Sequence, residues 1–311
     1  MQRLRIGIIG TGAIGGFYGL MLAKAGHDVH FLLRSEYQAV VASGLRLNSA
    51  VHGQLHLQPV QAWGDPAEMP ACDWLLVGAK TTSNAQLAPV ITRLSRPGTR
   101  VVLLQNGLAV EEQLRPLLPD NLHLLGGLCF ICTHRAAPGV IEHQALGAVN
   151  LGYHSGPAGA GESLAIVEEG AELFRSAGLE SVAMADLQQA RWQKLVWNVP
   201  YNGLSVLLGA GTTRLMANAD SRALILELMR EVVQGAAACG QVLPEGYPEK
   251  LLATTERMPD YLPSMYHDFQ HKRPLELQAI YAAPLAAAAA TGCELPKMRM
   301  LHQALRFLDA G

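Results

Sequence analysis

The sequence predicts an α/β protein with two halves of different kinds, an N-terminal half built on a parallel sheet and a C-terminal half that is all helical. Two observations predict this division. Short apolar runs alternate with helical segments through the first half, which is typical of a parallel sheet covered by helices on both faces. From Leu164 onward the strand signals stop and only helical patterns follow. A chain of 311 residues is long enough for two domains.

The boundary between the halves lies near a glycine-rich stretch, HSGPAGAGES, that resembles a linker. The helix after this stretch can still pack on the sheet, so the signals place the boundary between about residues 160 and 188. We therefore divide the chain into residues 1–185 and residues 186–311.

The strands of the first half are expected in five apolar runs and two alternating segments. The apolar runs are IGIIG, HDVHFLL, DWLLVGAK, RVVLLQNG and LHLLGGLCFI. The alternating segments, LRLNSAVHGQLHLQPV and GVIEHQALGAVNLGYH, predict hairpins that would add an antiparallel section. The helices expected in the second half are Leu164 to Ala177, Leu187 to Leu208, Ser221 to Gly240, Pro248 to Met258, Pro274 to Thr291 and Met298 to Leu308.

Composition excludes several classes of partner. The 24 basic and 26 acidic residues nearly cancel and form no long run of one sign, so nucleic acid and membrane are poor candidates. No secretory signal is visible at the start, so we expect a cytoplasmic protein. Five cysteines form no disulfide framework, and Cys129 and Cys132 read as positions in a buried strand, so no metal is expected. The alanine-rich segment near Ala286 allows a close helix contact within one subunit or between the subunits of a homodimer.

The motif GxGxxG, formed by Gly10, Gly12 and Gly15, directly follows the first predicted strand and opens a helix. In this context Gly10 permits a tight turn, Gly12 lets a pyrophosphate approach the backbone, and Gly15 lets helix and strand pack closely. The helix N-terminus offers free N–H groups and the positive end of its dipole. The first half is therefore predicted to be a Rossmann-type dinucleotide-binding domain.

Three later strand ends carry polar groups on the edge where such sheets bind ligands. Arg34 follows the second strand, where an NAD-binding protein usually has an acidic residue, and a basic residue there favours the 2′-phosphate of NADP. Lys80 and Asn106 follow two further strands. The alternatives are an exposed arginine, a solvated lysine and a simple Asn-Gly turn.

The stretch RWQKLVWNVPYNGL places Lys194, Asn198 and Asn202 four residues apart, on one face of an otherwise apolar helix. Polar groups inside a protein need partners, and a substrate can be one. Pro200 should kink the helix and free the carbonyl of Val196. The alternative is a helix whose lysine reaches solvent and whose asparagines bond to nearby backbone.

Taken together, these segments resemble the ketopantoate reductases (2-dehydropantoate 2-reductases). The resemblance covers nearly the whole chain, through GTGAIG, LLR, LLVGAK, LLQNG, RWQKLVWNVPYNGL, PSMYHDF and LELQAIYAAP in this order. It implies a Rossmann domain and a helical domain with NADPH in the cleft. The implied activity is the NADPH-dependent reduction of 2-dehydropantoate, a small 2-ketoacid, to pantoate in pantothenate biosynthesis.

The resemblance also implies roles for single residues. Lys194 matches the proton donor of the family, and Glu276 matches a glutamate that contacts the cofactor and organises the site. Cofactor contacts are implied for Gly10, Thr11, Gly12, Ala13, Ile14, Gly15, Arg34, Lys80, Asn106 and Glu276. Substrate contacts are implied for Asn106, Asn198, Asn202 and Ser264.

The chain departs from the family pattern at three places. Thr212 and Tyr261 stand where the family has asparagines, and LQAIYAAP replaces an acidic and Asn-Gly pattern after Glu276. These changes leave open a paralogous NADPH-dependent reductase of another branched or aromatic 2-ketoacid. A third reading is a non-catalytic NADP-binding sensor, against which the retention of Lys194 and Glu276 argues.

Overall fold

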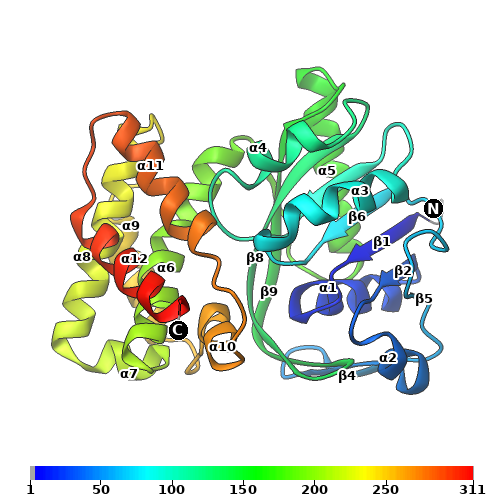
Figure 1. The fold of residues 1–311 in the computed structure, drawn as a ribbon, viewed down its shortest axis with the longest axis horizontal. Helices are drawn as coiled ribbons and strands as arrows, with labels where there is room; N and C mark the ends of the chain where they lie inside the picture. The colour runs from blue at the N-terminus through cyan, green and yellow to red at the C-terminus, as the bar shows by residue number, and fades with distance from the viewer. Residues whose placement is uncertain (1–3, 311) are drawn as a thin grey trace. The chain divides into compact units, whose positions relative to one another are not determined.

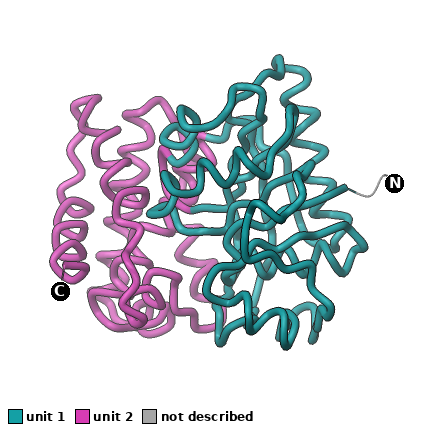
Figure 2. Tube along the Cα trace, turned by 45° about the vertical axis from the view of Figure 1, so that its right-hand side comes forward, with its two compact units in different colours: residues 1–105, 110–187 teal, residues 106–109, 188–311 magenta. Residues whose placement is uncertain are grey.

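The computed structural model describes residues 4–310, which form two compact units (Figure 2). Unit 1 runs to Gln105 and resumes over Val110–Leu187. Unit 2 runs from Gln188 onward and also includes the short segment Asn106–Ala109. The chain therefore crosses between the units three times, and Asn106 belongs to the helical unit although it follows a strand of the sheet.

Unit 1 contains a mixed sheet whose strands, within the described residues, run in the order β4-β3-β9-β8-β7-β6-β1-β2-β5, with β10 beside β9 (Figure 1). The bounds are β1 (Arg5–Ile9), β2 (Asp28–Leu32), β3 (Leu45–Ser49), β4 (Gly53–Leu57), β5 (Ala62–Trp63), β6 (Trp74–Val77), β7 (Arg100–Leu103), β8 (His123–Ala137), β9 (Val140–Ser155) and β10 (Ala183–Met184). From β5 through β8 every neighbouring pair is parallel. This succession is the Rossmann order, which confirms the predicted fold class.

The parallel strands form because their sequences are apolar on both faces. All four residues of β6 are buried, as are the last four of β1 and the last three of β7. The helices of unit 1 are α1 (Ala13–Lys24), α2 (Tyr37–Ser43), α3 (Asn84–Leu94), α4 (Val110–Leu114) and α5 (Ala160–Ser176), with the 3₁₀ turns Thr81–Ser83 and Arg115–Leu117. Helices α1 and α5 meet through the rings of Tyr18 and Phe174, 5.5 Å apart, within the main core.

Two expectations about the strands were wrong. The segment GVIEHQALGAVNLGYH is no hairpin: it lies in the single long strand β9, which pairs antiparallel with β8. Within this segment the strand is irregular at Leu146 and Gly147, which adopt φ values of 67° and 134° where the pairing register shifts. Strand β10 also lies beyond Leu164, where no strand was expected.

Unit 2 is helical in its described residues, as predicted. Its helices are α6 (Leu187–Leu208), α7 (Thr212–Ala217), α8 (Ala219–Ala238), α9 (Tyr247–Glu256), α10 (Ser264–Gln270), the π-helix η3 (Gln278–Ala282), α11 (Ala283–Ala290) and α12 (Pro296–Asp309). Among residues 4–310, no helix combines the length and the apolar character needed to cross a membrane.

The predicted helix from Pro274 to Thr291 was wrong at its start. Leu275 lies in no helix, with its N–H bonded to the carboxylate of Asp309 at 3.1 Å, and the first regular turns are π-helical. Pro284 has no N–H for the carbonyl of Ile280, so an α-helical bond is missing at this point whatever the pattern suggests. Helices α7 and α10 were not predicted.

The irregular position in β9 generates a stability prediction. Leu146 is 52% exposed and pays the steric cost of a left-handed backbone, which glycine avoids. We expect Leu146→Gly to raise the free energy of unfolding by about 0.5 kcal/mol in urea titrations, because relief of strain exceeds the entropy cost of glycine. The control Ala145→Gly, in the same strand without a left-handed φ, should lower it by about 1 kcal/mol. Equal destabilisation by both changes would contradict this assignment of strain.

Candidate functional site

The glycine turn lies where β1 ends and α1 begins. Gly10 has φ +86°, and a Cβ there would lie 2.4 Å from the backbone nitrogen of Ala79. A Cβ on Gly15 would lie 2.3 Å from the carbonyl oxygen of Gly10. These backbone contacts are possible only for glycine, so both residues are required by packing before any ligand is considered.

Gly12 differs from its two partners in the motif. A Cβ at Gly12 would meet nothing within 4 Å, and the residue precedes α1 without a side-chain cap. The Cβ direction of Gly12 therefore faces open space at the start of α1, where a pyrophosphate would find the positive end of the helix dipole. Thr11 ties the turn to the end of β2 through its hydroxyl, 3.3 Å from the carbonyl oxygen of Leu32, and Ala13 and Ile14 open the helix. The residues present thus fit a dinucleotide.

A basic side chain and a carboxylate that is already bonded within the protein follow the end of β2. Arg34 is exposed just beyond the strand. Glu36 was overlooked in the sequence, although an acidic residue here could bind a ribose hydroxyl. Its carboxylate is buried, paired with Arg135, and accepts the N–H of Gly139 at 2.9 Å. The arrangement at this strand end favours a 2′-phosphate over a free 2′-hydroxyl.

A buried amide pair supports the next strand ends. Gln105 Nε2 donates to Asn84 Oδ1 and to the carbonyl oxygen of Ala79, both at 2.7 Å, and Asn84 Nδ2 donates back to Gln105 Oε1 at 3.2 Å. This pair fixes Ala79, against which the Gly10 turn packs. Lys80 follows in extended backbone, three residues beyond β6, and is partly buried. Neither amide carried a local sequence signal, because they lie 21 residues apart.

Helix α6 carries the polar line of Lys194, Asn198 and Asn202, and its bounds agree with the prediction. Asn202 is anchored, since its Oδ1 accepts the N–H of Met265 at 3.3 Å. Asn198 is 5% exposed, and within residues 4–310 its buried Nδ2 has no hydrogen-bond partner. Lys194 is partly buried on the same face. A buried donor without a partner is unfavourable in the protein alone and is satisfied when a ligand supplies an acceptor.

Pro200 lies inside α6 without ending the helix. The hydroxyl of Tyr281 donates to the carbonyl oxygen of Val199 at 2.8 Å, next to the proline. Burial raises the pKa of Tyr281, so this hydroxyl keeps its proton and remains a donor. This hydrogen bond therefore links α6 to η3 beside the proline.

Unit 2 also brings Asn106 and Glu276 onto neighbouring segments. The N–H of Leu108 donates to the carbonyl oxygen of Ala279 at 2.9 Å, and a Cβ on Gly107 would lie 2.4 Å from that of Ala279. Glu276 is 4% exposed and lies two residues before η3, the π-helix that contains Ala279. The small residue at position 279 thus admits the segment with Asn106, which gives the LQAIYAAP sequence a packing role.

Ser264 is the first residue of α10, directly before Met265. The bond from Met265 to Asn202 therefore holds Ser264 near the polar line of α6. The structure joins Ser264 to Asn202 and Asn106 to the segment after Glu276. The cofactor residues Gly10, Gly12, Gly15, Arg34 and Lys80 all lie in unit 1.

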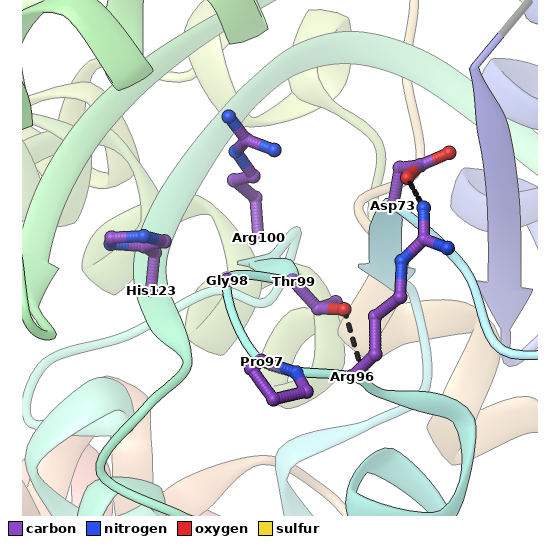
Figure 3. Close-up of a pocket in the computed structure, with 7 residues that line it drawn as sticks. All are labelled: Asp73, Arg96, Pro97, Gly98, Thr99, Arg100 and His123. Carbon is purple, nitrogen blue, oxygen red and sulfur yellow. Dashed lines mark hydrogen bonds and ion pairs between the residues drawn. The ribbon is translucent and has the colours of Figure 1, made fainter.

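A pocket of about 280 Å³ lies at the opposite, amino edge of the strands, beside the starts of β6, β7 and β8 (Figure 3). Two of its ion pairs are internal: Arg96 pairs with Asp73, and Arg100 bonds through one terminal nitrogen to Glu169 at 2.9 Å. Because ligands of such sheets bind at the carboxyl ends of the strands, this pocket is not the dinucleotide site. No group of three or more His, Cys, Asp or Glu residues suited to a metal occurs in the described part of the chain.

The Rossmann unit with its open glycine turn, and the helix with its lysine and asparagine line, define an oxidoreductase that uses a nicotinamide cofactor. The family model "Ketopantoate reductase PanE/ApbA" matches residues 6–156, and "Ketopantoate reductase PanE/ApbA C terminal" matches residues 186–309. A 2-dehydropantoate 2-reductase from Nostoc sp. is 41% identical over 99% of this chain and 96% of its own length.

Solved structures agree. The crystal structure of 2-dehydropantoate 2-reductase from Geobacter metallireducens has a TM-score of 0.91 and 40% identity, covering 97% of this chain and 99% of its own. That from Methylococcus capsulatus has a TM-score of 0.85 and 35% identity, covering 99% and 97%. The chain therefore belongs to the ketopantoate reductase family.

Replacement of the two asparagines of α6 should change the free energy of unfolding in opposite directions. Asn198→Leu removes a buried donor that has no partner, so we expect the free energy of unfolding of the ligand-free protein to rise by about 1 kcal/mol. Asn202→Leu leaves the Met265 N–H unpaired, so we expect a loss of about 1 kcal/mol or more. Urea unfolding of both variants measures the difference. If Asn198→Leu destabilised the protein as much as Asn202→Leu, the amide of Asn198 would have a partner within the protein and would not be kept for a ligand.

Proposed function

We propose that the protein catalyses the NADPH-dependent reduction of 2-dehydropantoate to pantoate, a step of pantothenate biosynthesis in the cytoplasm. The observation that carries the proposal is the buried Nδ2 of Asn198, which has no hydrogen-bond partner within residues 4–310, on the helix face that also presents Lys194. A buried donor of this kind is satisfied when a polar ligand supplies an acceptor. Membership of the ketopantoate reductase family names the ligand.

Residues 1–185 would bind NADPH and residues 186–311 would bind the ketoacid and supply the acid. In unit 1 the backbone of Gly10–Gly15 would hold the pyrophosphate, Arg34 the 2′-phosphate, and Lys80 the cofactor edge. From unit 2, Asn106 and Glu276 would contribute further cofactor contacts. This assignment rests on the open Gly12 position, the exposed Arg34 and the family resemblance.

NADPH, when bound, supplies the hydride for the carbonyl carbon of the substrate. The carbonyl oxygen needs a proton, which the cofactor cannot give. We assign this proton to the ammonium group of Lys194, with Glu276 organising the site. Asn106, Asn198, Asn202 and Ser264 would orient the carboxylate and hydroxyl of the ketoacid, which lowers the barrier because orientation is fixed before reaction.

A second candidate is a reductase of another branched or aromatic 2-ketoacid. Thr212 and Tyr261, which replace two asparagines of the family pattern, favour it. Comparison of kcat/KM over a panel of 2-ketoacids separates the candidates: 2-dehydropantoate should lead the panel, and a decisively better ketoacid would transfer the assignment to the second candidate. A non-catalytic sensor would bind NADPH and oxidise it with none of them.

We also propose a homodimer. Met300 and Phe307 lie seven residues apart on α12, which places them on one face, and their exposed fractions are 51% and 80%. Two large exposed apolar side chains on one helix face are suited to contact with a second subunit.

Lys194→Ala removes the proposed acid. We expect kcat for 2-dehydropantoate reduction to fall by about 100-fold or more, because general acid catalysis contributes at least that much. The dissociation constant of NADPH should stay unchanged. The matched control is Gln193→Ala, one position along α6 and so turned away from the polar line, which should keep wild-type kcat. A Lys194→Ala enzyme of full activity would sink the assignment of the proton donor.

A further inference from the structure

Thr212 and Tyr261, two positions where the sequence departs from its family, lie in direct contact. The N–H of Thr212 donates to the carbonyl oxygen of Tyr261, and the N–H of Tyr261 donates to the hydroxyl oxygen of Thr212, both at 3.0 Å. Thr212 is 1% exposed and Tyr261 9%. The two residues form one buried unit, although 49 positions separate them.

The hydroxyl proton of Thr212 is directed to a third residue. Asp260 Oδ1 lies 3.5 Å from the Thr212 hydroxyl and accepts the N–H of Thr213 at 2.9 Å. A Cβ on Gly211 would lie 2.6 Å from the same oxygen, so glycine at 211 lets the carboxylate approach this closely. The single hydroxyl of Thr212 thus accepts from Tyr261 and has the Asp260 carboxylate as an acceptor for its proton, so both of its functions have partners within the protein.

The contact fixes one end of a short connection to Ser264. Only Leu262 and Pro263 separate Tyr261 from Ser264. On the far side, the N–H of Met265 is bonded to Asn202 of α6. Ser264 is therefore held between two anchors, the Thr212 contact before it and the Asn202 contact after it.

The ring of Tyr261 adds a third fixation. It lies 6.4 Å from the ring of Trp197 on α6, and Trp197 stacks on Tyr201 at 4.6 Å. Trp197 is itself held by a 3.1 Å bond from its Nε1 to Thr255. The aromatic side chain at position 261 is thus used in packing against α6.

We propose that Thr212 is a positioning residue: its hydroxyl holds the backbone of Tyr261 and thereby sets the place of Ser264, and it does not bind the ketoacid itself. The inference rests on the proposed function for its kinetic consequences. Polar recognition of the ketoacid by the helical unit then falls to Asn198, Asn202 and Ser264, without a contribution from position 212.

The kinetic test compares Thr212→Val with Thr212→Ser. Valine keeps the shape and removes the hydroxyl, so we expect KM for 2-dehydropantoate to rise about fivefold while kcat stays within about twofold and NADPH binding is unchanged. Serine keeps the hydroxyl and should restore the wild-type KM. Failure of serine to restore it would overturn the proposal.

A double-mutant cycle with Ser264→Ala tests the route of the effect. If Thr212 acts through Ser264, Thr212→Val should change KM by less than about twofold once Ser264 is alanine, because the two effects are then not additive. A full fivefold effect in that background would mean that Thr212 acts on substrate by another route, and the proposal would fail.

Hydrogen exchange of the ligand-free protein tests the contact without turnover. Thr212→Val should increase exchange at least threefold in peptides spanning residues 261–270 and leave the peptides of β1 and β6 unchanged. Unchanged exchange at 261–270 would overturn the proposal even in an active enzyme. A wild-type protein that reduces no 2-dehydropantoate would instead overturn the proposed function, and the exchange result would still decide whether Thr212 positions this segment.

Discussion

Gly10, Gly15 and Gly78 bring backbone against backbone where β1 and β6 end, and the dinucleotide end of unit 1 is arranged around that contact. A Cβ on Gly78 would lie 2.8 Å from the nitrogen of Gly15, which is also closer than a side chain allows. Any side chain here would push α1 away from the sheet in which its residues Phe17 and Tyr18 are fully buried. The direction of the first turn of α1 is therefore set by packing before a phosphate binds.

In unit 2, two asparagines of one helix differ in the same way: one makes a bond within the protein, and the other keeps a donor for a ligand. Asn202 is used to hold the start of α10, whereas Asn198 keeps a buried donor that the described protein does not satisfy. A fold tolerates such a group only at a cost, and the cost is recovered when a ligand with an acceptor binds. Two buried asparagines four residues apart thus differ in the protein alone, because the amide oxygen of Asn202 holds Met265 whereas Nδ2 of Asn198 has no partner in the described residues.

The parts of the fold that depend on local pattern could be predicted from the sequence. The spacing of apolar residues predicts helix α6, the GxGxxG motif predicts the glycine turn, and the apolar runs predict the buried parallel strands. The parts that depend on distant partners could not. The irregularity in β9 could not be predicted, because a leucine, Leu146, occupies a left-handed position that usually holds glycine. The Gln105–Asn84 and Thr212–Tyr261 pairs join residues that are 21 and 49 positions apart. The exchange of Asn106–Ala109 into the helical unit likewise follows from packing against Ala279, which no local signal announces.

Gly10 and Gly15 are required by the packing of the turn, whereas Gly12 leaves room for the pyrophosphate. Isothermal titration of the Gly12→Ala variant with NADPH separates these two roles. The added methyl group has room in the free protein, so its thermal midpoint should equal that of the wild type. It would stand where the pyrophosphate approaches, and the dissociation constant should rise by about tenfold or more, a loss of about 1.4 kcal/mol. Wild-type affinity in a normally folded Gly12→Ala protein would contradict the account.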